Sequence, residues 1–300
     1  MVKRLFEKAF LSGYYFTIAM RRRTEGGILQ DDSFRSEYVF PAKLKDWAAD
    51  PVLVDDADRT YLFYEAVKGE KGRIEVVEVY EDCSVSSPVV ILEDGYHYSY
   101  PFVFNHKGKW YMIPESSSQQ EVVLYQATDF PYQWKPAALL LSGFPAVDTS
   151  VFSHNGDMYL LTYVPNPPTE QVTPKAYRMD FDESVCLTEI PWKNFDPLRS
   201  RGAGAIFTYA DMMYRPAQVN ETYRYGNALA FYEVNPEKSV YSETERYEIT
   251  PSKLTIPNVR FDGLHTYAVS ARFEAIDIRC RDIDIYKIFR KVWKKLFRRN

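Results

Sequence analysis

The chain has 300 residues and is rich in aromatic side chains, with 24 Tyr, 19 Phe and 5 Trp. This composition favours a single all-β domain, because aromatic residues prefer strands. The net charge is −4, yet residues 287–300 hold seven Lys or Arg and no acid, which leaves −11 for the remainder. An acidic body of this kind is a poor general nucleic-acid binder, since phosphate binding depends on surplus Lys and Arg.

The N-terminal segment is apolar between residues 9 and 20, but this run is shorter than a membrane span. We therefore predict a strand over residues 13–22 and no secretion signal. Cys83, Cys186 and Cys280 are isolated and odd in number, which disfavours a disulfide framework and a zinc site. These features indicate a reducing, cytoplasmic setting.

A repeat with a period near fifty residues follows. Each copy reads as an apolar strand, a polar turn and an aromatic-rich second strand, which is typical of a β-hairpin. In the first copy the two strands cover residues 50–54 and 61–65, and in the second copy they cover residues 100–104 and 110–115. In the third copy they cover residues 148–152 and 158–163, and in the fourth copy residues 201–207 and 212–215. A fifth, weaker copy begins at residue 263. Additional strands are expected at residues 72–79 and 121–125.

Three or four strands in each of five repeats predict a five-bladed β-propeller that occupies residues 1–283. The N-terminal strand around residues 14–20 precedes the first repeat, so we expect it to complete the last blade and close the ring. A β-sandwich is the alternative, but it does not predict a fifty-residue period.

Residues 284–300 follow another pattern. Ile, Val, Leu, Phe and Trp fall on one helical face and the Lys and Arg residues on the other. Such a basic amphipathic helix is typical of a segment that lies on an anionic membrane surface. The alternative is a helix docked on the propeller or on a partner. We expect a peripheral protein on the inner face of the membrane.

Equivalent positions of propeller blades face one another across a central funnel. The first strands begin at chemically different polar residues, and the second strands return to the same rim. Such a group of ionisable side chains is usually functional, because burial and like charges shift pKa values. The converging residues are Asp50, His97, Asp148, Arg201, His265, Glu65, Glu115 and Arg215. The alternative is a purely structural role, in which Glu65 or Glu115 pairs with an arginine and only supports the scaffold.

At these segments the chain resembles the N-terminal domain of plant glucosamine inositolphosphorylceramide transferases and their bacterial relatives, a domain related to the five-bladed propellers of family 43 glycoside hydrolases. The matching motifs are WAADP at 47–51, YLFYE at 61–65, HYSYPFV at 97–103, YMIPES at 111–116, RPAQ at 215–218, Tyr225-Gly226 and GLHT at 263–266. Within them we expect Tyr100, Gln218 and Tyr225 to contact the substrate.

The resemblance implies a carbohydrate-active site. In the hydrolases an Asp of the first blade is the general base, which Asp50 matches in position, and Asp148 and Glu115 would supply the other two carboxyl groups. His97 stands near the place of a second-blade acid, and this departure disfavours hydrolysis. A hydrolase or phosphorylase and a non-catalytic glycan-binding propeller remain as alternatives.

Arginine and histidine side chains instead suit an anionic ligand, because Arg binds phosphate oxygens in a bidentate fork. We therefore predict a glycosyltransferase of surface-glycan biosynthesis, with a nucleotide sugar or phosphoribosyl pyrophosphate as donor and a glycan or lipid-linked acceptor. Asp50 or Asp148 would accept the proton of the acceptor hydroxyl. No cofactor is certain from the sequence; Mg²⁺ bridging a diphosphate and carboxylates is compatible with such a site.

Overall fold

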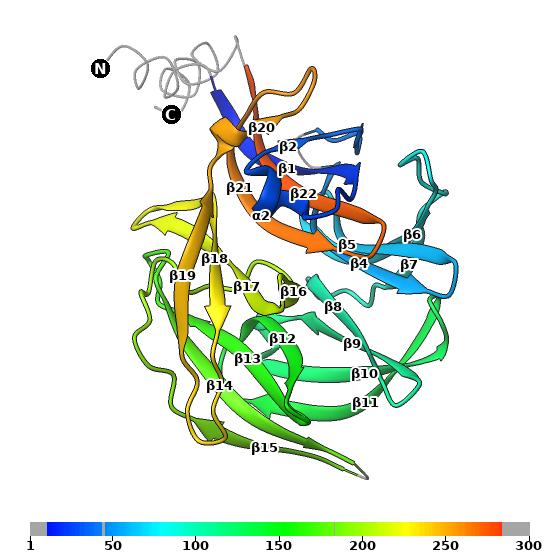
Figure 1. Ribbon diagram of the computed structural model, residues 1–300. Coiled ribbons are helices and arrows are strands. Elements are labelled where there is room, and N and C mark those ends of the chain that lie inside the picture. Colours follow the sequence, from blue (N-terminus) through cyan, green and yellow to red (C-terminus); the bar gives the residue numbers. More distant parts are fainter. Residues whose placement is uncertain (1–10, 44–45, 183, 284–300) are drawn as a thin grey trace, which may run out of the picture.

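The computed structural model describes residues 11–43, 46–182 and 184–283 as five four-stranded antiparallel sheets arranged around a central axis (Figure 1). Innermost strands contact one another from the fifth sheet to the first, from the first to the second and from the second to the third, and the fourth sheet contacts the fifth through its second and third strands. This arrangement confirms the five-bladed β-propeller. The expected helix over residues 284–300 lies outside the described residues.

The first three blades follow the chain directly, and each is numbered from its innermost strand outwards. Blade I contains β4 (Asp46–Asp56), β5 (Arg59–Lys68), β6 (Lys71–Val79) and β7 (Val89–Leu92). Blade II contains β8 (Ser99–His106), β9 (Lys109–Glu115), β10 (Glu121–Asp129) and β11 (Gln133–Ser142). Blade III contains β12 (Val147–His154), β13 (Asp157–Pro165), β14 (Val172–Phe181) and β15 (Val185–Ile190).

The last two blades depart from this simple order. Blade IV contains β16 (Phe207–Tyr209), β17 (Met212–Glu221), β18 (Arg224–Val234) and β19 (Glu243–Ile249). Blade V contains β21 (Phe261–Val269), β22 (Phe273–Ile283), β1 (Leu11–Arg22) and β3 (Tyr38–Val39). The remaining elements are α2 (Gly27–Asp31), the 3₁₀ turns η1 (Ser117–Gln119) and η2 (Pro251–Lys253), and a small parallel pair of β2 (Phe34–Arg35) with β20 (Leu254–Thr255).

The N-terminal strand closes the ring as expected. Strand β1 pairs antiparallel with β22 from Leu11↔Ile283 to Arg22↔Phe273, so chain segments from the two ends share one sheet. Because β1 supplies the third strand of blade V, this blade cannot form without both ends of the described chain.

The fourth repeat is less regular than its sequence predicts. We expect one strand over residues 201–207, but β16 covers only Phe207–Tyr209. Upstream of it, Gly202 forms an isolated bridge with Ala217. Gly204 has φ +138°, and a Cβ there would lie 2.0 Å from the carbonyl oxygen of Tyr267. This close approach of two backbones requires glycine and interrupts the strand.

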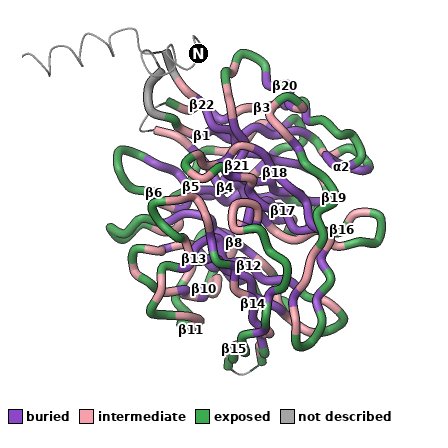
Figure 2. The backbone as a smooth tube through the Cα atoms, turned by 90° about the vertical axis from the view of Figure 1, so that its left-hand side faces the viewer, coloured by how far each residue is buried: buried purple, intermediate pink, exposed green. Residues whose placement is uncertain are grey.

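The core is divided among the blade interfaces. Each of the five contacts between neighbouring blades holds its own cluster of buried apolar side chains. Figure 2 shows buried residues along the inner strands and exposed residues along outer strands and turns. The apolar face of every blade thus packs on the next blade, and the polar residues at the inner strand ends remain free to line the central funnel.

Candidate active site

The central pocket, here called the funnel, has a volume of about 370 Å³. It is lined by Tyr14, Phe16, Trp47, Ala49, Asp50, Glu65, His97, Ser99, Glu115, Asp148, Glu170, Arg201, Tyr225 and His265. All five blades contribute to this lining. The structure therefore brings together eight residues that the sequence analysis assigns to the site, namely Asp50, Glu65, His97, Glu115, Asp148, Arg201, Tyr225 and His265.

A β-bulge shapes the inner strand of each of the first three blades. Asp50, Tyr100 and Asp148 occupy the same place in their blades, and all three have left-handed backbones, with φ values of 52°, 41° and 49°. The strand register shifts at each of these positions. A bulge re-aims the side chain of the extra residue, which is how Asp50 and Asp148 leave the sheet face and enter the funnel.

Each bulge also frees a backbone N–H that an acidic side chain of the preceding blade accepts. The N–H of Asp50 donates to Oδ2 of Asp277 at 2.9 Å, and that of Tyr100 donates to Oδ2 of Asp50 at 3.1 Å. The N–H of Asp148 donates to Oε2 of Glu115 at 3.1 Å. The carboxyl groups of the funnel are therefore oriented from blade to blade by the backbone.

Asp277 is the main residue that the sequence analysis missed. Its side chain is fully buried in β22, where it accepts bonds from the backbone and side chain of Thr266 and from Nδ1 of His265 at 2.9 Å. Nε2 of His265 is hydrogen-bonded to the Tyr225 hydroxyl. A buried Asp thus fixes a histidine that in turn fixes a tyrosine of the funnel. The sequence signal is weak: Asp277 stands between two isoleucines, with Arg279 two residues further on.

Arg201 and Asp148 form the central ion pair, with Nε of the arginine 2.5 Å from Oδ2 of the aspartate. The guanidinium also lies over the Tyr225 ring, 4.9 Å from its centroid. Among the described residues no further hydrogen bond of this guanidinium is found, so four of its five N–H donors remain for a ligand.

His97 and Glu65 form a second pair at the funnel wall, with Nε2 and Oε1 3.1 Å apart. The Gly72 N–H donates to Nδ1 of His97, which places the imidazole proton on Nε2, facing Glu65. A Cβ at residue 72 would lie 2.4 Å from Oε1 of Glu65, so glycine is needed for this approach.

The electrostatics of the funnel favour bound protons. Burial raises the pKa of Asp50 to about 8, and the charges of Glu65, Asp277 and Asp148 add to this effect against that of His265. Burial, followed by the charge of Asp148, raises the pKa of Glu115 to about 8. Burial opposes protonation of His265, but the charges of Asp277 and Asp50 outweigh it and raise that pKa to about 9.

Three residues expected at the site do not line the funnel. Arg215 is 1 % exposed and forms a bidentate ion pair with Glu243, while its guanidinium also lies over the Trp192 ring. This pairing holds Arg215 between blades III and IV, because an unpaired buried cation would be very costly. The expectation that Arg215 returns to the rim beside Glu65 and Glu115 is therefore wrong.

Gln218 and Tyr100 are buried behind the wall of the funnel and support the residues that line it. Nε2 of Gln218 donates to the carbonyl oxygen of Gly202 at 2.8 Å. The backbone N–H of Gln218 donates to the carbonyl oxygen of Arg201. The Tyr100 hydroxyl accepts the N–H of Gly204, so this side chain reaches from blade II to blade IV. Both residues position the segment that carries Arg201 and are buried away from the funnel.

A metal would most readily be sought at Asp50, His265 and Asp277, whose ligand atoms lie within 4.8 Å of one another. The Asp277 oxygens, however, already accept several hydrogen bonds, and its side chain is inaccessible. Mg²⁺ keeps several waters in most protein sites. These three residues therefore do not fit a magnesium ion.

The fold resembles that of several solved glycoside hydrolases. An α-L-arabinofuranosidase from Lactobacillus brevis matches with a TM-score of 0.52 and 14 % identity over 74 % of this chain and 79 % of that one. A Bombyx mori GH32 β-fructofuranosidase matches with a TM-score of 0.54 and 13 % identity over 71 % of this chain and 53 % of that one. At such identities the likeness extends to the fold alone.

Relatives by sequence are named glucosamine inositolphosphorylceramide transferase 1. The protein from Oryza sativa subsp. japonica is 25 % identical over 246 residues, which cover 75 % of this chain and 31 % of the relative. The one from Arabidopsis thaliana is 34 % identical over 116 residues, which cover 38 % of this chain and 15 % of the relative. The chain thus spans about a third or less of the length of these relatives.

The family model described as the N-terminal part of glucosamine inositolphosphorylceramide transferase 1 matches residues 34–257, which include all strands of blades I to IV. This match covers most of the chain and includes seven of the eight predicted residues that line the funnel, His265 being the exception. The chain therefore belongs to the family of glucosamine inositolphosphorylceramide transferase 1 N-terminal domains.

Proposed function

We propose that this protein is a glycosyltransferase that moves a sugar from a phosphate-activated donor to a hydroxyl of a glycan or lipid-linked acceptor. The observation that carries the proposal is the meeting of Asp50, Glu115 and Asp148 with Arg201 in one funnel. The names of the sequence relatives support a transferase. Nucleotide sugars and phosphoribosyl pyrophosphate are the donor candidates.

In this mechanism the acceptor oxygen forms a bond to the anomeric carbon while the bond from that carbon to the leaving phosphate oxygen breaks. In its deprotonated form Asp50 accepts the acceptor proton, and its pKa of about 8 makes this carboxylate a stronger base than an ordinary one. Arg201 binds the departing phosphate through its remaining N–H donors. Asp148 holds the guanidinium in place.

A membrane attachment belongs to the same proposal. The basic amphipathic pattern of residues 284–300 supports binding to an anionic surface, which would bring the funnel to a lipid-linked acceptor. No helix among the described residues is long and apolar enough to cross a membrane. Strand β22 leads into this segment, and its last residue, Ile283, pairs with Leu11.

The first prediction concerns the donor. Phosphate-activated sugars should raise the melting temperature of the pure protein, because a ligand that binds only the native state stabilises it by mass action. We expect the shift to disappear in Arg201→Ala and to persist in Arg199→Ala, which removes a guanidinium paired with Glu245 and Glu248 outside the funnel. Thermal-shift assays with nucleotide sugars, phosphoribosyl pyrophosphate and neutral oligosaccharides, with and without magnesium, measure this. Stabilisation by neutral oligosaccharides alone would favour a hydrolase or a binding module instead.

The second prediction concerns Asp148. Asp148→Asn should reduce turnover about 100-fold or more, because a neutral amide no longer holds Arg201 by charge, while the protein stays folded. Asp180→Asn, at an exposed position of the same blade, should leave turnover unchanged. Turnover with the donor identified above and circular dichroism provide the test. Normal turnover in Asp148→Asn would remove this residue from the mechanism.

The third prediction follows from the raised pKa of Glu115. Its proton stabilises the folded state at low pH, and that contribution is lost as the pH rises through about 8. Glu115→Gln should therefore melt at an increasingly higher temperature than the wild type between about pH 5 and 9, by about 5–10 °C at the upper end, because the rise of the pKa from 4.5 to about 8 corresponds to about 5 kcal/mol. Glu121→Gln, at the start of β10, is the control. A constant difference across this range would show that Glu115 titrates normally.

The fourth prediction concerns the chain end. Deleting residues 287–300 should abolish co-sedimentation with vesicles of phosphatidylcholine and phosphatidylserine, because seven positive charges are removed. The melting temperature should change little. Vesicles of phosphatidylcholine alone are the control and should bind the full chain weakly. Undiminished binding of the shortened chain to the anionic vesicles would contradict the proposed attachment.

A further inference from the structure

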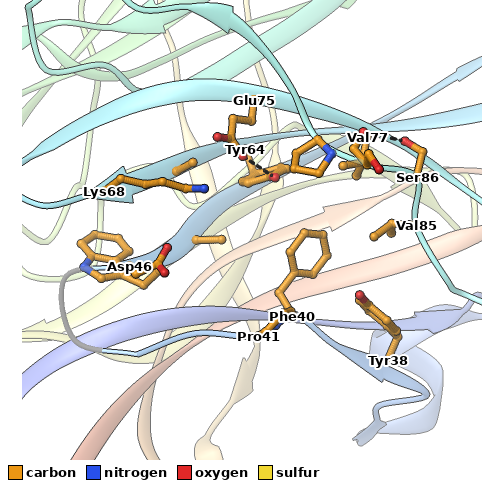
Figure 3. A pocket seen from close by; sticks show the side chains of 15 residues that line it. Tyr38, Phe40, Pro41, Asp46, Tyr64, Lys68, Glu75, Val77, Val85 and Ser86 are labelled. Atoms are coloured by element: carbon orange, nitrogen blue, oxygen red, sulfur yellow. Dashed lines mark hydrogen bonds between the residues drawn. The ribbon is translucent and has the colours of Figure 1, made fainter.

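A second cavity lies where blade V meets blade I, and its volume is about 450 Å³ (Figure 3). We call it the side cavity and define it by Tyr38, Phe40, Trp47, Tyr64, Lys68 and Glu75. The mechanism proposed for the funnel uses none of these residues. A cavity of this size with aromatic walls and a few polar groups is typical of a site for a small ligand.

Small residues keep this part of the blade interface open. Ala48 of β4 and Ala66 of β5 lie directly opposite each other in the strand register, and both line the side cavity. Their methyl groups occupy little space, so the wall of the side cavity at this level is formed by two short side chains.

A buried carboxylate at the wall of the side cavity has spare hydrogen-bonding capacity. Glu75 is 3 % exposed; its Oε1 accepts two bonds from Arg73, and its Oε2 accepts the Tyr64 hydroxyl at 2.8 Å. A carboxylate has about four acceptor positions. One position on Glu75 therefore remains for a hydroxyl or ammonium group of a ligand.

The mouth of the side cavity adds groups of both charges. Asp46 and Lys68 are cross-strand partners, and Figure 3 shows the Lys68 ammonium extending towards the cavity between Tyr64 and Asp46. Aromatic faces suit the apolar side of a sugar ring, and charged groups suit its hydroxyls. The spare position of Glu75 can only accept a hydrogen bond, which suits a hydroxyl or an ammonium group and not a carboxylate. Among the described lining residues, this favours a neutral or amino sugar over an acidic one.

Trp47 connects the two cavities, because it lines both the funnel and the side cavity. Its ring also packs against Phe16 of the funnel, with centroids 5.8 Å apart. A glycan whose reacting hydroxyl enters the funnel can therefore continue past this indole. We propose that the side cavity binds a neutral or amino sugar of the acceptor glycan, adjacent to the sugar that reacts; this assignment rests on the proposed function.

The test follows the indole N–H signal of Trp47 by NMR on the full chain, assigned by its loss in Trp47→Phe. The probes are methyl β-D-galactopyranoside, galactosamine and galacturonate at up to about 100 mM, so that dissociation constants in the millimolar range can be measured. Ala66→Leu fills the side cavity and Arg201→Ala alters the funnel. Lys68→Ala is the milder variant, and Lys109→Ala in blade II is its control.

We expect the neutral and amino sugars to shift the Trp47 signal in the wild type and in Arg201→Ala, but not in Ala66→Leu. Lys68→Ala should weaken binding about 3- to 10-fold, and Lys109→Ala should not change it. Because Lys68 is exposed, this variant stays informative if Ala66→Leu does not fold. No shift with any probe, a shift that survives in both Ala66→Leu and Lys68→Ala, or preferential binding of galacturonate would overturn the proposal.

Acceptor kinetics separate this proposal from the proposed function. If the wild type transfers a sugar and Ala66→Leu and Lys68→Ala leave the KM for the acceptor unchanged, the side cavity is not an acceptor site although the transferase stands. If no activated donor stabilises the protein while the probes still bind beside Trp47, the transferase fails and the cavity is a glycan site of another kind. A higher acceptor KM with an unchanged donor KM supports both.

Discussion

The site depends on the left-handed bulge in the inner strand of the first three blades. A non-glycine residue with positive φ costs about 1–3 kcal/mol and persists only where the surroundings hold it. Here the surroundings are the carboxyl groups of the preceding blade, which accept the N–H groups of Asp50, Tyr100 and Asp148. Closure of the ring and the geometry of the funnel are thereby linked, since each bulge needs its neighbouring blade.

The same link explains the protonation of the funnel. The carboxyl groups that accept these N–H groups are crowded, and two of them, on Asp50 and Glu115, have raised pKa values. Among the described lining residues, Arg201 and the histidines are the groups that oppose this concentration of acids. An incoming phosphate therefore meets one well-held guanidinium among acids that can be neutral near pH 7. The arrangement fits a site in which a proton is exchanged during turnover.

Outside the funnel, two structural devices keep its walls in place. Arg215 and Glu243 form a buried pair between blades III and IV, and Gln218 holds the backbone that carries Arg201. On the opposite side, β1 completes blade V and brings Phe16 next to Trp47 and His265. The side cavity begins at this seam, so the closing strand contributes to one face of the funnel and the fold leaves a second opening beside it.

The sequence by itself determined the blades, because alternating apolar strands, turns and a fifty-residue period are local properties. It also determined that Asp50 and Asp148 occupy equivalent places, since they begin equivalent strands. Tyr100 occupies the equivalent place in blade II, but only the tertiary structure decided that its buried side chain supports the backbone at Gly204. Only the tertiary structure, likewise, decided that Arg215 pairs with Glu243. It likewise revealed Asp277, which lies 227 residues from the backbone N–H that it accepts. Such outcomes depend on partners from other blades or from distant strands of the same blade, and no local pattern encodes which buried charge will find which partner.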